Sequence, residues 1–263
     1  MALGRVVKRT FIASDLIVFQ GVSPTKIRKS LVGRRVQSVH RRGKHVWFEL
    51  DERPWPCFHL GMAGHFRAPN DDPLRYRSSG NRPPDRDWPP RYVKIRFVFE
   101  NGGELAMTDK RRFARVRLLI DPLHEPPISE LGFDPLLDLP TPKRFVSLMR
   151  ARRGAVKGLL LDQSFAAGVG NWIADEVLYQ AKIDPRRKID ALRDDEIKAI
   201  RRALKRIVEK AVAVEARKER FPKSWLFHDR WDRNGEARTA GGEKIEHITV
   251  SGRTTAWVPD VQT

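Results

Sequence analysis

Apolar and polar residues alternate with a period of two through much of the first half of the chain, a pattern typical of half-buried β-strands. Two such runs flank the turn sequence RRGK (41–44), and two more flank NGG (101–103). Each pair predicts a β-hairpin because a short glycine-containing turn separates its runs. An earlier alternating run, FIASDLIVF (11–19), predicts a further strand.

The second half of the chain has its apolar residues mostly at helical spacing. Residues 144–153 predict one helix, and the apolar positions between 197 and 211 predict a longer one. The stretch 159–185, LLLDQSFAAGVGNWIADEVLYQAKIDP, predicts two helices separated by the small-residue turn AAGVGN. Asn171 stands at the expected N-cap of the second of these helices, and Asp184-Pro185 at its end. Residues 243–259 alternate again around SGR and predict a terminal hairpin.

Two proline-rich stretches divide this pattern. Residues 70–91 combine proline with charge and predict a long surface loop, whereas residues 121–142 separate the β-rich half from the helical half. The sequence therefore predicts an α+β protein with a β-rich domain over 1–122, a linker over 123–142 and a helical domain over 143–263 that ends in the hairpin at 243–259.

The net charge of the chain indicates what kind of partner it could bind. The chain carries 51 Lys and Arg against 33 Asp and Glu, a net charge of +18. Such an excess favours a polyanionic partner, although a basic surface that binds nothing and a ribosomal-type protein are also consistent with it. Cys57 is the only cysteine, which excludes an intrachain disulfide and a zinc site built from cysteines, so we expect no metal. No apolar run is long enough to span a bilayer.

The glycine turn before Asn171 has two interpretations. Gly168 and Gly170 allow a close approach of the backbone, and the free N–H groups at a helix start bind anions, here a nucleic-acid phosphate. Ordinary packing of two helices explains the same residues equally well.

This stretch resembles the helix–two-turn–helix signature of the formamidopyrimidine-DNA glycosylase and endonuclease VIII family. Five further segments follow the family's order with similar spacing: RRGKHVWFEL (41–50), FHLGMAGHF (58–66), TDKRRFARVRLL (108–119), ISELGFDPL (128–136) and SGRTTAWVP (251–259). The cysteine-free terminal hairpin is similar to the zincless finger of the plant and fungal branch. The resemblance implies an N-terminal β-sandwich, a C-terminal helical domain with that finger, and double-stranded DNA bound between them.

The resemblance also implies a chemistry and residues for it. The family excises oxidised bases, such as 8-oxoguanine, formamidopyrimidines and their further-oxidised products, cleaves the abasic site, and needs no cofactor. It flips the damaged nucleotide out of the duplex and fills the vacated space. On the matching positions, Met62 and Phe113 would intercalate and Arg111 would pair with the orphaned base. Without the resemblance, Met62 and Phe113 would be assigned to the core and Arg111 to the solvated surface.

Four residues would hold the DNA phosphates by the same match: Lys44, His59, Asn171 and Arg253. The alternatives are ordinary turn residues for Lys44 and Arg253, and a hydrogen-bonded core histidine for His59. Glu176 matches an acidic residue near the family's site and is a candidate catalytic group. A carboxylate placed in the first turns of a helix to satisfy its dipole explains Glu176 almost as well.

One feature departs from the family pattern. The family's nucleophile is an N-terminal proline amine followed by a glutamate acid, and MALGRVVKRTFI resembles the segment after them. We therefore expect this sequence to bind abasic DNA and to form little borohydride-trapped adduct. One alternative to an active enzyme is therefore an inactive binder of damaged DNA with the same fold. A second is an rRNA-binding protein, because a similar helix–turn–helix unit occurs in a small-subunit ribosomal protein. We expect a monomer in the nucleus or otherwise the cytoplasm. A transit peptide is less favoured, because the basic start alternates like a strand.

Overall fold

The computed structural model describes residues 2–71, 86–232 and 235–263. The chain divides into two compact units, Met1–Glu130 and Leu131–Thr263. The division falls within the stretch 123–142 that the sequence predicts as a linker. Most of the predicted surface loop over 70–91 lies outside the described residues.

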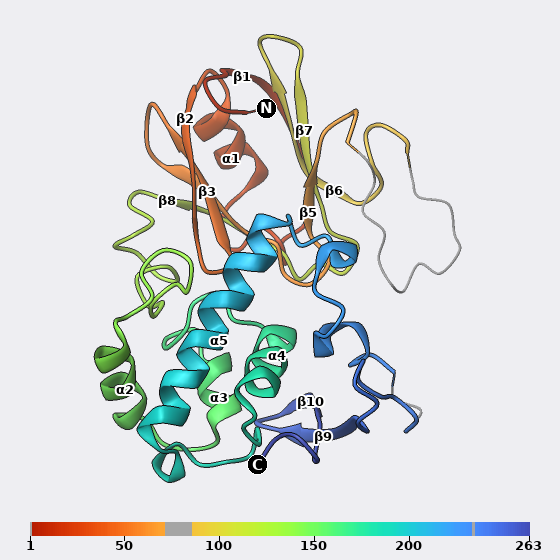
Figure 1. Cartoon of the computed structure of the whole chain (residues 1–263). Helices are drawn as coiled ribbons and strands as arrows, with labels where there is room; N and C mark the ends of the chain where they lie inside the picture. Colours follow the sequence, from red (N-terminus) through yellow and green to blue (C-terminus); the bar gives the residue numbers. More distant parts are fainter. Residues whose placement is uncertain (1, 72–85, 233–234) are drawn as a thin grey trace. The chain divides into compact units, whose positions relative to one another are not determined.

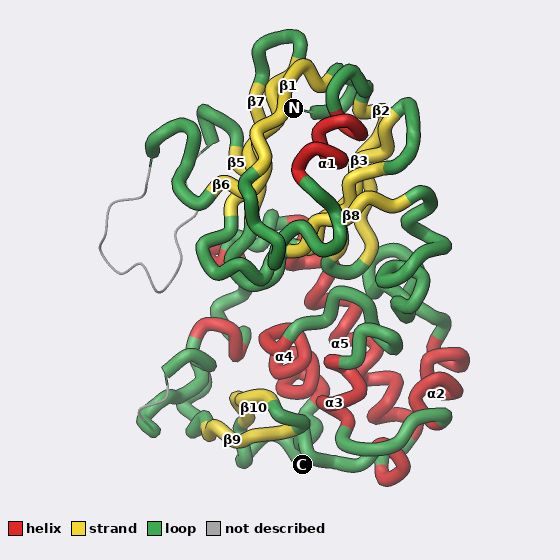
Figure 2. Tube along the Cα trace, turned by 180° about the vertical axis from the view of Figure 1, so that it is seen from behind, coloured by secondary structure: helices red, strands yellow, loops and turns green. Residues whose placement is uncertain are grey.

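In its described residues, the first unit contains two four-stranded antiparallel sheets and one helix (Figures 1 and 2). The first sheet has the order β1 (Val7–Ile12), β6 (Val93–Phe99), β7 (Glu104–Thr108) and β5 (His65–Arg67). The second has the order β2 (Val36–Arg42), β3 (His45–Leu50), β4 (Trp55–His59) and β8 (Arg115–Leu119). Helix α1 (Pro24–Leu31) begins at the N-cap Ser23, whose hydroxyl accepts the N–H of Lys26.

The two sheets share one aromatic core. The ring of Phe97 in β6 lies 5.7 Å from that of Phe48 in β3 and 6.3 Å from that of Phe58 in β4, measured between centroids. Ile27 and Leu31 of α1 are buried in the same cluster. Since inward-facing residues of both sheets meet in it, the unit is a β-sandwich, and the predicted N-terminal β-domain is confirmed.

The hairpins predicted around 41–44 and 101–103 are present, with β2 paired to β3 and β6 to β7. The strand predicted over 11–19 is wrong beyond Ile12. The chain turns there because the Asp15 carboxylate accepts the backbone N–H groups of Ile17 and Val18, which an extended strand would not allow.

The second unit is helical and ends in a two-stranded hairpin (Figure 1). Its helices are α2 (Pro142–Arg150), α3 (Val156–Leu161), α4 (Asn171–Ala181) and α5 (Asp194–Ala213), with short 3₁₀ turns η2 (Ile189–Ala191), η3 (Lys218–Arg220) and η4 (Leu226–His228). The hairpin pairs β9 (Glu246–Val250) with β10 (Arg253–Trp257). The predicted helices and terminal hairpin are therefore confirmed. α4 ends before the expected Asp184-Pro185, because Lys182 adopts a left-handed conformation with φ 59°.

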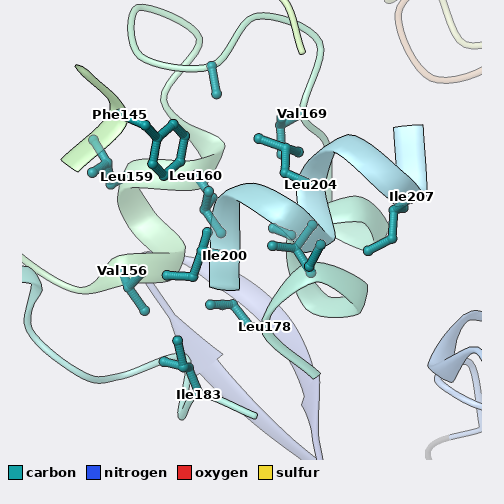
Figure 3. Packing of buried hydrophobic residues seen from close by; sticks show 14 of the residues in the cluster. Phe145, Val156, Leu159, Leu160, Val169, Leu178, Ile183, Ile200, Leu204 and Ile207 are labelled. Carbon is teal, nitrogen blue, oxygen red and sulfur yellow. The ribbon is translucent and has the colours of Figure 1, made fainter. Parts of the chain in front are cut away.

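One apolar cluster fills this unit. Ile200, Leu204 and Ile207 of α5 are fully buried in it, together with Leu160 of α3 and Leu178 of α4 (Figure 3). A smaller cluster under the terminal hairpin joins Ile245, Ala256 and Val258 to Leu226 of η4. Among the described helices, none has the length and apolar composition of a membrane span.

Candidate nucleic-acid interface

Two loops of the first unit carry exposed apolar residues. Met62 lies in the loop between β4 and β5 and is 70% exposed, and Phe113 lies in the loop between β7 and β8 and is 44% exposed. Arg111, in the same loop as Phe113, is also exposed. The core assignment considered for Met62 and Phe113 is therefore wrong. Exposed apolar side chains that gather at one place are typical of a surface that contacts a partner, whereas single ones are common.

The structure brings these three residues together. Gly61 lies so close to Phe113 that a Cβ atom placed on it would be 2.6 Å from the Phe113 carbonyl carbon and 2.8 Å from the Phe113 Cβ. Gly61 also has φ +62°, a conformation that glycine adopts without steric cost. The Arg111 guanidinium lies 4.7 Å from the centroid of the Phe113 ring. An apolar pair and a planar cation thus form one exposed group.

Two buried carboxylates that the sequence did not single out hold this group. Asp109 is fully buried and accepts the backbone N–H of Arg111 at 2.9 Å and that of Ala114 at 2.7 Å. Asp15 accepts two nitrogens of Arg112, at 3.0 and 3.1 Å, and the Lys94 ammonium at 2.8 Å. Burial alone would raise the pKa of Asp15, but these partners outweigh it and hold the pKa well below its usual value.

The predicted phosphate contacts of the first unit meet at the β2–β3 turn. Lys44 is exposed in that turn, and the neighbouring His45 is paired across the sheet with His59, with 4.9 Å between ring centroids. The backbone N–H of Gly61 donates to Nδ1 of His59 at 3.2 Å, so the ring proton of a neutral His59 is on Nε2. Burial and then the Lys44 charge lower the pKa of His59, which favours that neutral form.

Asn171 and Arg253 lie on neighbouring elements of the second unit. Gly170, and not the expected Asn171, is the N-cap of α4, and Asn171 is the first residue of the helix. The reason is that the Asn171 side chain donates from Nδ2 to the Thr254 carbonyl at 2.8 Å instead of accepting a backbone N–H of its own helix. Arg253 begins β10 and is exposed beside the hairpin turn.

Glu176 has a task within the fold. Its carboxylate is fully buried and accepts Nε2 of Gln180 at 2.7 Å and the backbone N–H of Phe227 at 2.8 Å. Burial raises its pKa to about 7. The helix-dipole explanation is therefore wrong, because the carboxylate links α4 to η4 rather than facing the free N–H groups of the helix start. Its catalytic role stays a prediction.

In the described part of the chain, no group of three or more His, Cys, Asp or Glu side chains is arranged so that it could bind a metal ion. The candidate residues for DNA contact are Met62, Arg111 and Phe113 with Lys44 and His59 in the first unit, and Asn171 with Arg253 in the second; their contact with DNA stays a prediction.

Family comparisons cover both units. Residues 1–116 match the formamidopyrimidine-DNA glycosylase N-terminal domain, residues 131–222 its H2TH domain, and residues 225–259 the formamidopyrimidine-DNA glycosylase-like C-terminal domain. A formamidopyrimidine-DNA glycosylase of Arabidopsis thaliana is 43% identical over 260 residues, which are 99% of this chain and 66% of that protein. The enzyme of the same name from Geobacter metallireducens is 31% identical over 91% of this chain and 86% of that protein.

Solved structures agree on the fold. The Lactococcus lactis formamidopyrimidine-DNA glycosylase bound non-covalently to DNA containing an AP site has a TM-score of 0.77 and 24% identity, covering 99% of this chain and 93% of that one. A complex of the same Lactococcus lactis protein with DNA containing FAPY-dG has a TM-score of 0.79, covering 100% and 94%.

Proposed function

The chain belongs to the formamidopyrimidine-DNA glycosylase family, and from this membership we propose that it recognises oxidised bases and abasic sites in double-stranded DNA as a base-excision-repair glycosylase. The observation that carries the proposal is the exposed group of Met62, Arg111 and Phe113. Exposed apolar side chains gathered with a cation at one place are typical of a surface that contacts a partner.

A damaged base that leaves the duplex supplies such a receiving space. Extrusion costs a few kcal/mol of lost stacking, and apolar side chains that enter the vacated step recover part of it. Met62 and Phe113 would occupy that step. Arg111, already oriented by stacking on Phe113, would donate its planar set of N–H groups to the base left without a partner.

Phosphate contacts would come from Lys44, His59, Asn171 and Arg253. They differ in kind: Lys44 and Arg253 contribute charge, whereas the neutral His59 would donate from Nε2 and Asn171 from its amide. The surplus of basic residues over the whole chain supports the same partner, since a protein of charge +18 gains from counterion release on DNA.

The two alternatives are not favoured. The relatives are DNA glycosylases, and an rRNA-binding protein has no vacated base for Met62 and Phe113 to replace. An inactive binder of damaged DNA would not be expected among relatives that carry the glycosylase name over most of this chain. We further propose a monomer, and a nuclear location in keeping with the plant relative.

Binding measurements test the recognition step. Fluorescence anisotropy would compare a duplex carrying a tetrahydrofuran abasic analogue with the intact duplex, for the unmodified protein and for Met62→Ala, Arg111→Ala and Phe113→Ala. We expect each variant to lose about tenfold of the preference for the abasic duplex. Leu16→Ala is the matched control, because Leu16 is an exposed apolar residue of the same unit with 81% exposure that is outside the proposed site. Equal affinity of the unmodified protein for both duplexes would refute the proposal.

A further inference from the structure

A buried ionic cluster in the second unit has no part in the interface described so far. Asp175 of α4 and Lys157 of α3 are both completely buried, and their Oδ1 and Nζ atoms are 2.6 Å apart. Arg230, which follows η4 and is also buried, lies 2.5 Å from the other carboxylate oxygen of Asp175. Burying three charged side chains is costly unless each one is paired, so their place in the fold needs a reason.

Each member of this cluster contacts the terminal hairpin. The backbone N–H of Ala256 donates to Asp175 Oδ2 at 3.2 Å, and Lys157 Nζ donates to Thr255 Oγ1 at 2.5 Å. The carbonyl of Arg230 lies 2.9 Å from Nε2 of His247, on the opposite strand of the hairpin. The cluster therefore binds both β9 and β10 to the helices.

The hairpin also packs closely on α3. A Cβ atom on Gly158 would lie 2.5 Å from Oγ of Ser251 in the hairpin turn, so only glycine allows this approach without displacement. A two-stranded hairpin is marginally stable by itself, and this one contains no cysteine that could hold a metal. Its position must come from such contacts with the helices.

The cluster is unbalanced in charge. Among its three members, two cations face one carboxylate while Lys157 is protonated. The buried Glu176 also interacts with the charge of Arg230, but burial raises its pKa to about 7, which limits the negative charge it adds. Arg253 begins β10 directly before Thr254 and Thr255, to which the Lys157 ammonium donates. Burial lowers the pKa of Lys157, Asp175 raises it, and Arg230 and Arg253 lower it further. Asn171 is linked to the same place, because its amide and the Lys157 ammonium donate to one acceptor, the Thr254 carbonyl.

We propose that Asp175 is a positioning residue: through Lys157 and Arg230 it holds the terminal hairpin against α3 and α4, and these three residues are called the clasp below. An anion bound at Arg253 and Asn171 balances the excess positive charge of the clasp. The anion would be a DNA phosphate, and this second part rests on the proposed function. Phosphate binding and hairpin docking then reinforce each other, since each one lowers the cost of the other.

Hydrogen exchange in the DNA-free protein tests the clasp. Asp175→Asn keeps the shape of the side chain and removes the only negative charge of the cluster. We expect the amides of residues 246–257 to exchange about a hundredfold faster, while those of α5 keep their protection. Asp194→Asn is the control, because Asp194 is an exposed partner of Arg150 in the same unit, and its loss should leave the hairpin unchanged. Unchanged hairpin exchange in Asp175→Asn, or equally faster exchange in α5, would overturn the clasp.

Arg230→Met tests the charge. It leaves one cation facing one carboxylate, so the variant should fold even where Asp175→Asn does not, and it should still expose the hairpin amides selectively. Arg230 is buried, yet its loss should weaken binding to the abasic duplex about tenfold, because the local positive excess is gone. Unchanged affinity would overturn the charge balance. Failure of the unmodified protein to bind abasic DNA would overturn the proposed function and the phosphate step, while exchange without DNA still decides the clasp.

Discussion

Replacement of Gly61 by alanine should separate the two loops of the proposed void-filling group. The substitution places a methyl group 2.6 Å from the carbonyl carbon of Phe113 and 2.7 Å from its oxygen, where the backbone cannot yield as a side-chain end could. It also puts a non-glycine residue at φ +62°. The conformational cost is about 1–2 kcal/mol, and overpacking adds about 1–3 kcal/mol. We therefore expect a loss of about 2–5 kcal/mol of folding stability.

Gly21→Ala is the matched control. Gly21 belongs to the same unit and has φ +68°, but a Cβ atom there would meet nothing within 4 Å. The folding stability of Gly21→Ala should fall by the conformational cost alone, about 1–2 kcal/mol. The difference between the two variants in urea unfolding therefore isolates the contact between Gly61 and Phe113.

The same pair of variants links the contact to function. If Met62 and Phe113 enter one vacated base step, a displaced loop should lower the ratio of affinities for abasic and intact duplex about tenfold in Gly61→Ala. Affinity for intact duplex should fall less than this, because His59, which accepts the Gly61 N–H, is one of four proposed phosphate contacts. Gly21→Ala should keep the full ratio. Equal destabilisation of both variants, or an unchanged ratio in a folded Gly61→Ala protein, would refute the reasoning.

Three further predictions concern the second unit. Arg253→Ala should weaken DNA binding and make the plot of log affinity against log salt less steep by about one unit, because one charged phosphate contact is lost. Asn171→Ala should weaken binding with a smaller change of slope, because asparagine carries no charge. Titrations at several salt concentrations measure both effects, and unchanged affinity in both variants would remove these residues from the interface. Because the pKa of Glu176 is raised from its ordinary value of 4.5 to about 7, its contribution to folding stability is full below pH 4.5 and is lost as pH rises through about 7. The stability of Glu176→Gln in urea unfolding should therefore depend less on pH between these values. An equally steep dependence of stability on pH in the variant would contradict this. Elemental analysis of the purified protein should find no stoichiometric zinc, and a zinc-bound protein would contradict the predicted cysteine-free finger.

The elements of the fold were predictable where a single face is buried. The alternating runs around 41–44 and 101–103 became β2–β3 and β6–β7, and the helical spacing between 197 and 211 became the buried face of α5. Prediction failed at the ends of helices and strands, where a single hydrogen-bonding partner determines the residue at which the element begins or ends. Asp15 turns the chain after Ile12, and the Thr254 carbonyl takes the Asn171 amide away from its own helix. Neither partner is visible from periodicity.

The candidate site was predictable only through the family motifs. Periodicity and composition assigned Met62 and Phe113 to the core, because an apolar residue without context is most often buried. Asp109 could have been suspected, since a carboxylate two residues before Arg111 is suited to accept N–H groups of a turn. Asp15 could not, because its partner Arg112 is distant in the sequence.

The ionic cluster around Asp175 shows the same limit at greater sequence distance. In the sequence, Lys157, Asp175 and Arg230 are three ordinary charged residues on separate predicted elements of a chain that carries 84 such residues, 51 basic and 33 acidic. Only folding brings them together, and only burial gives their pairing a large energetic weight, because an unpaired charge in the interior costs several kcal/mol. Composition therefore indicates a polyanion as partner, while the residues that orient the proposed DNA-binding side chains come from the few charges that the fold removes from water.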